Sequence, residues 1–398
     1  MITTTKSSRW SRIRWQGLSL SIVCLLFAGA LYAHREWVRS WEVSYSRQCR
    51  EARDDSRWVD LQRLGEQWTT WDRRNADAWL FRADAAQHQG DFQSAATFLE
   101  SIPESAAKSL PALVSLATLQ FGPLNRPLDG VRTCERMLKL EPRTTAAHHQ
   151  LIEFYAMSLQ RRQLDFHIRF AIQCLREPPS AYVYLFLIDT MRLDAGVELN
   201  AKWLTQYPDN DIFQVAHLLQ MPEPDSGVRS GSGDDKYSLA DALFERFPKN
   251  LELLAYKVDL SIRRGNVEEV MELLRGLPPE ADEDCRFWRA KGWLHLSRDE
   301  VLTAKQALQT AIDIYPMDWN ARNWMADALR REGNSVAAEP LQSIVQSARK
   351  LREKITGTGT TENVQNEILM EIAQFSRRCG DVQIDDALSR RLGLKQPN

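Results

Sequence analysis

Residues 285–318 decide the fold, and they read CRFWRAKGWLHLSRDEVLTAKQALQTAIDIYPMD. Within this 34-residue unit, Trp288 falls at position 4, Gly292 at position 8, Ala304 at position 20 and Pro316 at position 32. Small residues at positions 8 and 20 let two helices approach closely, and a proline at position 32 stops the second helix. The stretch therefore predicts a pair of antiparallel α-helices joined by a short turn.

The same pattern recurs on both sides of this unit. Residues 319–352 continue in phase, and residues 76–108 repeat the pattern with the same small, large and glycine positions. The matching residues are Met325, Ala326, Leu329, Gly333 and Ala338 in the first of these units, and Trp79, Ala83, Gly90, Ala95 and Leu99 in the second. Large residues at positions 4, 7 and 11 would line one helix face, and glycine at position 15 permits a tight turn. Each pair would leave an apolar face that only a neighbouring pair can cover.

Weaker matches fill most of the remaining chain. Residues 111–144, 145–178 and 251–284 keep several of the large positions, whereas Arg82 and Lys257 place a charge at position 7 of their units. We expect those two pairs to pack less regularly. A proline- and glycine-rich segment at 221–237 predicts a loop, followed by a helix from Ser238 to Phe247.

The 34-residue pattern resembles the tetratricopeptide repeat family over most of residues 50–352. The resemblance implies an all-α fold, an α-solenoid of about nine antiparallel helix pairs, as in membrane-anchored bacterial-type members. The expected organisation assigns a basic tail to 1–16, a transmembrane helix or signal anchor to 17–34, an N-terminal array to 35–220, a linker to 221–237, a C-terminal array to 238–354 and capping helices to 362–398.

The N-terminal segment predicts attachment to a membrane. Residues 18–33 carry no charge and would cover roughly 24 Å as a helix, somewhat less than the roughly 30 Å hydrocarbon core of a bilayer. Trp10, Trp15 and Trp37 flank the run where an aromatic belt would lie. A cleaved signal peptide, ending near Ala28-Gly29-Ala30, is the first alternative, and a buried globular helix is the second.

Charge is distributed unevenly along the chain. The first 50 residues hold eight basic and two acidic side chains, so the formal total of −2 divides into a +6 head and a −8 body. The N-terminal side of the uncharged run carries slightly more lysine and arginine than the C-terminal side does. This difference predicts a cytoplasmic tail and a body outside the cytoplasm. An acidic body argues against nucleic-acid binding, which needs clustered cations.

No motif in the sequence predicts catalysis or a cofactor. There is no nucleophile elbow, P-loop, dinucleotide-binding turn or HExxH motif. His148 and His149 are adjacent, so on a helix they point about 100° apart and could not serve one site. The six cysteines form no CxxC pair and no zinc-ligand spacing, which favours buried thiols. We expect neither an enzyme nor a metal, although an enzyme on a helical scaffold without a known motif stays an alternative.

Binding of a protein or peptide is the function that the resemblance implies. In the family, positions 2, 5, 9 and 12 of each first helix line a concave groove. The candidates here are Arg286, Arg289 and Trp293 in one unit and Asn320, Asn323 and Arg330 in the next. Arginine could make forked contacts with the carboxylates of an acidic peptide. The sequence predicts that Arg289→Glu with Arg330→Glu abolishes capture of the partner without unfolding the array.

Overall fold

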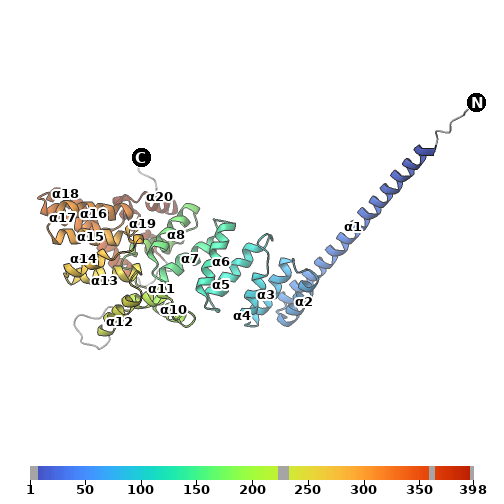
Figure 1. The fold of residues 1–398 in the computed structure, drawn as a ribbon, viewed down its shortest axis with the longest axis horizontal. Coiled ribbons are helices and arrows are strands. Elements are labelled where there is room, and N and C mark those ends of the chain that lie inside the picture. The colour runs from blue at the N-terminus through green and yellow to red at the C-terminus, as the bar shows by residue number, and fades with distance from the viewer. Residues whose placement is uncertain (1–7, 223–232, 358–363, 395–398) are drawn as a thin grey trace, which may run out of the picture. The chain divides into compact units, whose positions relative to one another are not determined.

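The described part of the chain is helical throughout. The computed structural model describes the backbone of residues 8–222, 233–357 and 364–394, and the side chains of these residues except 8–28, 194 and 233–235. Within these ranges the chain forms twenty α-helices and one short 3-10 helix, η1 (Pro279–Glu283), and no strand (Figure 1). An all-α fold of successive helices, compatible with a helical solenoid, is thus confirmed.

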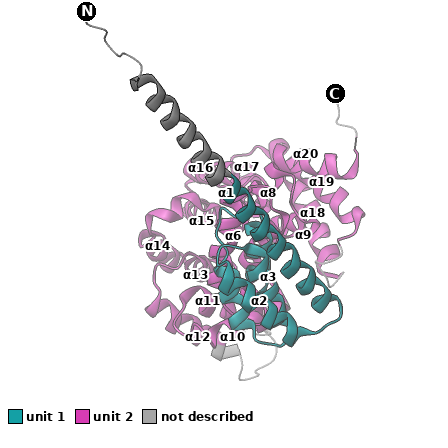
Figure 2. Cartoon of the chain, turned by 90° about the vertical axis from the view of Figure 1, so that its right-hand side faces the viewer, with its two compact units in different colours: residues 1–119 teal, residues 120–398 magenta. Residues whose placement is uncertain are grey.

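The chain divides into two compact units, which are coloured separately in Figure 2. Unit 1 comprises residues 1–119 and holds the helices α1 (Ser8–Asp54), α2 (Trp58–Trp71), α3 (Ala76–His88), α4 (Phe92–Glu100) and most of α5 (Ser109–Phe121). Its core gathers Cys49, Leu61, Trp68 and Ala78 from the first three helices.

Unit 2 comprises residues 120–398 and holds the remaining fifteen helices. They are α6 (Pro127–Leu140), α7 (Thr145–Met157), α8 (Arg161–Cys174), α9 (Pro179–Leu187), α10 (Asp194–Leu204), α11 (Asp211–Gln220), α12 (Gly233–Arg246), α13 (Leu251–Arg263), α14 (Val267–Arg275), α15 (Cys285–Ser297), α16 (Val301–Ile314), α17 (Trp319–Arg331), α18 (Ser335–Gly357), α19 (Asn366–Cys379) and α20 (Val382–Leu392). The predicted linker at 221–237 falls within this unit, and α12 begins inside it, while residues 223–232 lie outside the described part.

The backbone itself carries the repeat period. Seven residues in the left-handed conformation lie in the turn between the two helices of a pair, position 15 of the repeat. Within each series they are 34 or 35 residues apart: Ser56, Gly90, Asn125 and Leu159, then Gly265, Asp299 and Gly333. Only three of these seven residues are glycine, although a residue with a side chain costs about 1–2 kcal/mol in this conformation. The tight turn is therefore set by the packing of the helix pair and not by glycine alone.

Position 4 carries a second repeating contact. Trp79, His148, Gln214 and Trp288 each place a side-chain nitrogen within hydrogen-bond distance of the carbonyl oxygen six residues earlier, in the loop that enters the helix. The distances for Trp79 and Trp288 are 2.8 and 2.9 Å. This contact ties the incoming loop to the first helix of the pair.

The small positions permit close approach, as the sequence predicts. A Cβ atom on Gly292 of α15 would lie 2.5 Å from Cγ of Leu308 on α16. The charged position 7 of two units is accommodated by pairing. The Arg82 guanidinium lies 4.0 Å from the ring centre of Phe98 and donates to Thr69, and Lys257 forms an ion pair with Asp241.

The last helix pair of unit 2 returns to its early helices. Helix α19 contacts α9 as well as its neighbours α18 and α20, and the rings of Phe186 and Phe375 meet edge to face at 5.3 Å. The buried hydroxyl of Tyr315 donates to the carbonyl oxygen of Leu185 at 2.6 Å. Arg169 of α8 binds Asp381, which caps α20, at 2.9 Å. Unit 2 thus closes upon itself, and α8 and α9 contact segments about 130 to 210 residues further along.

No helix in the described part of the chain meets the length and hydropathy needed to cross a bilayer. The predicted anchor at 17–34 lies largely among residues 8–28, whose side chains are outside the described part.

Candidate functional site

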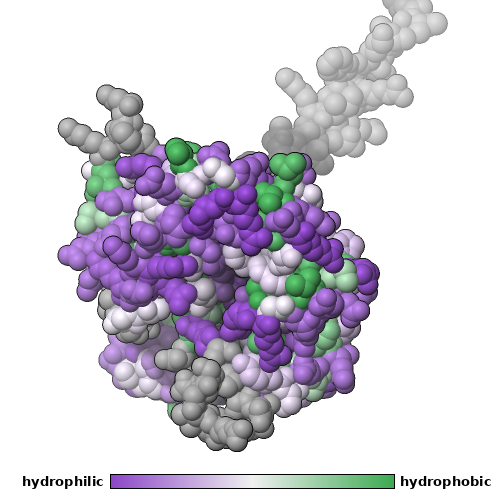
Figure 3. Space-filling model, turned by 90° about the vertical axis from the view of Figure 1, so that its left-hand side faces the viewer, coloured by the Kyte–Doolittle hydropathy of each residue, from purple (hydrophilic) through white to green (hydrophobic). Residues whose placement is uncertain are grey.

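A polar pocket lies in unit 2. Figure 3 shows one face of the molecule, which is hydrophilic over most of its area and hollowed near its middle. The pocket has a volume of about 540 Å³. Helices α13, α15 and α17, each the first helix of its pair, line the pocket together with the segment 187–192 and the end of α18. Its charged residues are Arg161, Asp189, Arg192, Glu252, Asp259, Arg263, Arg286, Arg289 and Arg352, and Asn320 contributes an amide. Six arginines therefore face three carboxylates in the lining.

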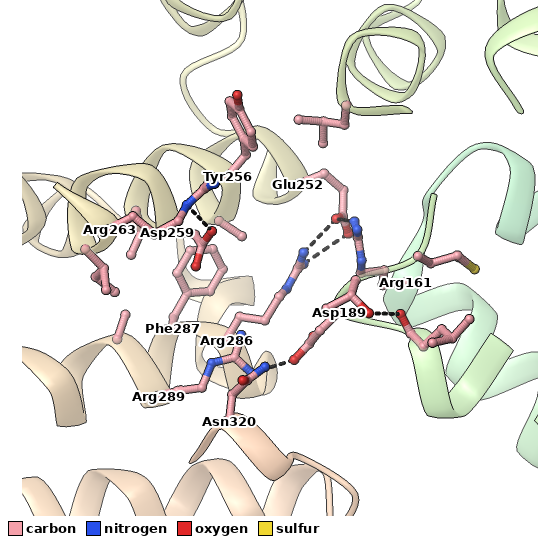
Figure 4. A pocket seen from close by; sticks show the side chains of 18 of the residues that line it. Arg161, Asp189, Glu252, Tyr256, Asp259, Arg263, Arg286, Phe287, Arg289 and Asn320 are labelled. Carbon is pink, nitrogen blue, oxygen red and sulfur yellow. Dashed lines mark hydrogen bonds and ion pairs between the residues drawn. The ribbon is translucent and has the colours of Figure 1, made fainter. Parts of the chain in front are cut away.

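Arg286 is held in the pocket wall by two carboxylates. Its guanidinium binds Glu252 of α13 at 2.6 and 3.0 Å (Figure 4). It also binds Asp284 at 2.6 and 3.0 Å. Asp284 also caps α15 by accepting from the Arg286 backbone nitrogen. Burial alone would lower the pKa of Arg286, but Asp284 and Glu252 outweigh it and raise the pKa well above its ordinary value. Arg161 of α8 completes the cluster by pairing with the same Glu252.

Arg289 is held in a second cluster one turn along α15. It pairs with Asp189, which follows α9, and with Asp318 at 2.7 Å. Asp318 caps α17 by accepting from the Ala321 backbone nitrogen at 2.8 Å. Burial and the neighbouring Asp189 raise the pKa of Asp318 despite the opposing effect of Arg289.

These clusters position the helices and engage both guanidinium groups, Arg286 through all three of its nitrogens and Arg289 through Nη1. Both arginines are about one-tenth exposed, and each bridges segments that are far apart in sequence. Buried pairs of this kind fix geometry, and removing one partner leaves an uncompensated charge. The groove candidates Arg286 and Arg289 are thus built into the wall. The substitution Arg289→Glu, which the sequence predicts to spare the fold, would set a third carboxylate beside Asp189 and Asp318.

The other four candidates are distributed differently. Asn320 is half-buried and lines the pocket, whereas Trp293, Asn323 and Arg330 do not belong to its lining. Arg330 is exposed, and its guanidinium is 3.4 Å from the side-chain oxygen of Gln342. The structure thus brings Arg286, Arg289 and Asn320 to one pocket and leaves the other three outside it.

The accessible cations lie at the rim of the pocket. Arg192 and Arg352 are exposed, and Arg263 is about half exposed and pairs with Asp259 at 3.1 Å. Half-buried Trp324 adds an aromatic surface beside them. Sequence reasoning from repeat positions missed these rim residues, because Arg192 and Arg352 come from a loop and from a second helix.

His148, singled out in the sequence, and His167 and Asp165 of α8 all make structural contacts. His148 is fully buried, its Nε2 lies 2.7 Å from the Pro142 oxygen, and burial lowers its pKa. His167 stacks on Tyr155, and burial lowers its pKa to about 4. Asp165 pairs with Arg169 at 2.9 Å. Among the residues whose side chains are described, no group of His, Cys, Asp or Glu could hold a metal ion, and the five cysteines are free thiols.

Comparison with known proteins yields structural matches alone. No protein family and no curated protein matches the sequence. Solved structures that match include a tetratricopeptide repeat protein from Parabacteroides merdae, with 12% identity over 64% of this chain and 98% of that chain and a TM-score of 0.30. Yeast Tom70 matches with 13% identity over 89% and 85% of the two chains and a TM-score of 0.28. A human IFIT1 dimer with m7Gppp-AAAA matches with 12% identity over 89% and 77% and a TM-score of 0.33. Scores of this size do not establish a shared function.

Proposed function

We propose that this protein is a membrane-anchored scaffold that binds a protein or peptide ligand in the pocket of unit 2. The observation that carries the proposal is the pocket itself, whose walls are fixed by ion pairs and whose rim offers accessible arginines. A preformed site loses little conformational freedom on binding, so a modest set of contacts suffices for affinity.

The rim favours an acidic segment as the ligand. Arg263 and Arg352 stand on different helices, and Asn320 and Trp324 of α17 belong to the same lining. An extended peptide could place a carboxylate against the rim arginines and an apolar group on the tryptophan. Catalysis, cofactors and nucleic acid are not part of the proposal.

The anchor of the proposal is the uncharged run within residues 17–34. The run lies within a single helix, α1, that continues into the core of unit 1, so the body would be connected to the bilayer without a flexible linker. We propose that the body lies outside the cytoplasm, because the N-terminal tail carries the excess of lysine and arginine. Intact mass of the mature full chain tests the anchor: loss of about thirty residues would identify a cleaved signal peptide and a soluble scaffold instead.

Site-specific photo-crosslinking in cells tests the pocket without knowledge of the ligand. We expect p-benzoylphenylalanine at Asn320 to capture a protein, and the same probe at Gln309, exposed on α16, to capture none. Arg263→Glu with Arg352→Glu should remove the crosslink, because the accessible cations of the rim are reversed.

The matched control is Arg275→Glu with Arg349→Glu, which reverses two exposed arginines outside the pocket lining. Arg349 stands on α18, nearly one turn before Arg352. Equal crosslinking in both double variants would refute binding at the rim.

A further inference from the structure

An aromatic ladder runs along one face of α1. His34, Trp37, Trp41 and Tyr45 are spaced by three or four residues, and successive ring centres lie 6.0, 6.1 and 5.9 Å apart. Tyr45 then stacks on Trp68 of α2 at 5.9 Å with 14° between the ring planes. The ladder therefore begins in the core of unit 1 and continues along α1 beyond it.

The upper part of the ladder is uncovered. Trp68 is 1% exposed, whereas Trp41 is 43% and Trp37 is 52% exposed. Leu31 and Tyr32, which precede His34 by three and two residues, are exposed as well. Two large indole rings left open to water on one helix face indicate a surface that another medium covers.

The register of the ladder matches the edge of a bilayer. A hydrocarbon core of roughly 30 Å takes about 20 helical residues, so a core centred on the uncharged run 18–33 would end near residue 35. Trp37 would then stand about 2 Å and Trp41 about 8 Å beyond the core, where the headgroup layer begins and ends. On the other side of the run, Trp15 and Trp10 are nearly as many residues from the centre of the run as Trp37 and Trp41 are.

Lipid headgroups fit this face better than a second copy of α1. Tyr45 is already covered by Trp68, so among the described side chains the uncovered stripe, from Leu31 to Trp41, is shorter than two heptads, and a stable coiled coil needs three or four. The exposed Arg35 and Arg39 flank Trp37 along the helix. Arginine beside tryptophan is instead the composition of the membrane interface.

We propose that Trp37 and Trp41 lie in the lipid headgroup layer and that the ladder, through Tyr45 and Trp68, seats unit 1 at the membrane surface. The inference rests on the anchor of the proposed function and adds a second, interfacial contact to it. Because the ladder stacks continuously into the core of unit 1, the distance between the bilayer and that unit would be fixed.

Photo-crosslinking of the full chain in vesicles of phosphatidylcholine and phosphatidylglycerol tests the inference. With p-benzoylphenylalanine at position 37 or 41 we expect lipid adducts by mass spectrometry. The probe at Val59, an exposed apolar residue at the start of α2, should give none. A covalent dimer or an adduct with another protein at 37 and 41 would overturn the assignment to lipid.

Vesicle flotation separates this inference from the anchor. A chain that fails to float with vesicles would refute the anchor and the ladder together. A chain that floats but gives no lipid adduct at either position would refute the ladder alone. Trp37→Ser with Trp41→Ser should still float, and the loss of headgroup contact should speed tryptic cleavage after Arg39, whereas an unchanged cleavage rate would contradict the inference. Circular dichroism of that variant checks that the helices are retained.

Discussion

Replacing Arg289 by methionine should destabilise unit 2, because two carboxylates depend on that guanidinium. Asp318 is 1% exposed at its side chain and Asp189 is 14% exposed, and both contact Arg289. Methionine keeps much of the aliphatic volume of arginine, so the change removes charge and hydrogen bonds more than packing.

The magnitude follows from the burial of the two acids. Removing one partner of a buried ion pair costs about 3–5 kcal/mol. Asp189 borders the pocket and can regain water, while Asp318 keeps its hydrogen bond from Ala321, so we expect the lower end, about 3 kcal/mol. Arg289→Glu should cost more, since it adds a third carboxylate.

The loss should depend on pH with a defined sign. Without Arg289, the pKa of Asp318 rises further above its unfolded value, so the folded state binds more protons than the unfolded state. The penalty is then relieved as pH falls toward the unfolded pKa of about 4 and grows as pH rises toward the folded pKa. Asp189→Asn in the Arg289→Met background should restore part of the stability, because it removes one of the two unpaired charges.

Hydrogen exchange measured by mass spectrometry on α15 and α17 is the assay, since it reports unit 2 separately from unit 1. Arg298→Met, at the exposed C-terminal cap of α15, is the matched control and should change stability by less than about 0.5 kcal/mol. Equal protection in the Arg289 and Arg298 variants would refute the reasoning that the cluster holds the pocket wall.

Three further variants test the fold. Gly265→Ala, at a turn with φ of +69°, should lower the free energy of unfolding by about 1 kcal/mol, whereas Gly357→Ala should not; equal effects in urea titrations would contradict the turn argument. Tyr315→Phe should cost about 1–3 kcal/mol by leaving the Leu185 carbonyl without its donor, and an unchanged melting temperature would argue against closure of unit 2 at this point. His167 has a pKa lowered to about 4, so stability should fall as pH drops from about 6.5 to about 4, and His167→Phe should flatten that part of the curve.

The helix pairs and their period follow from the sequence, because they depend on residues within about 34 positions of one another. Pro142 and Pro316 stand two residues after the last residues of α6 and α16, and Gly292 stands where α16 packs closely, as predicted. The turn residues were harder to recognise: Leu159 and Asp299 adopt the left-handed conformation that the sequence would have assigned to glycine. Their strain is offset by the packing of both helices, which no single position reveals.

The functional interpretation of the arginines depended on tertiary structure. Repeat positions placed Arg286, Arg289 and Asn320 in one pocket, but they could not show that Glu252 and Asp189 occupy the two guanidinium groups. Of the partners, Asp284 and Asp318 could have been anticipated as caps directly before each first helix.

The sequence by itself determined the all-helical class, the 34-residue helix pair and the uncharged N-terminal run, because each rests on local periodicity and composition. Only the tertiary structure decided that α19 and α20 return to α8 and α9. It also decided that Arg286 and Arg289 are paired within the pocket wall, whereas Arg263 and Arg352 lie at its rim. The physical reason is that a repeat specifies contacts with its immediate neighbours. The closure of unit 2 instead depends on single complementary pairs, such as Arg169 with Asp381, whose members are 212 residues apart and leave no periodic trace.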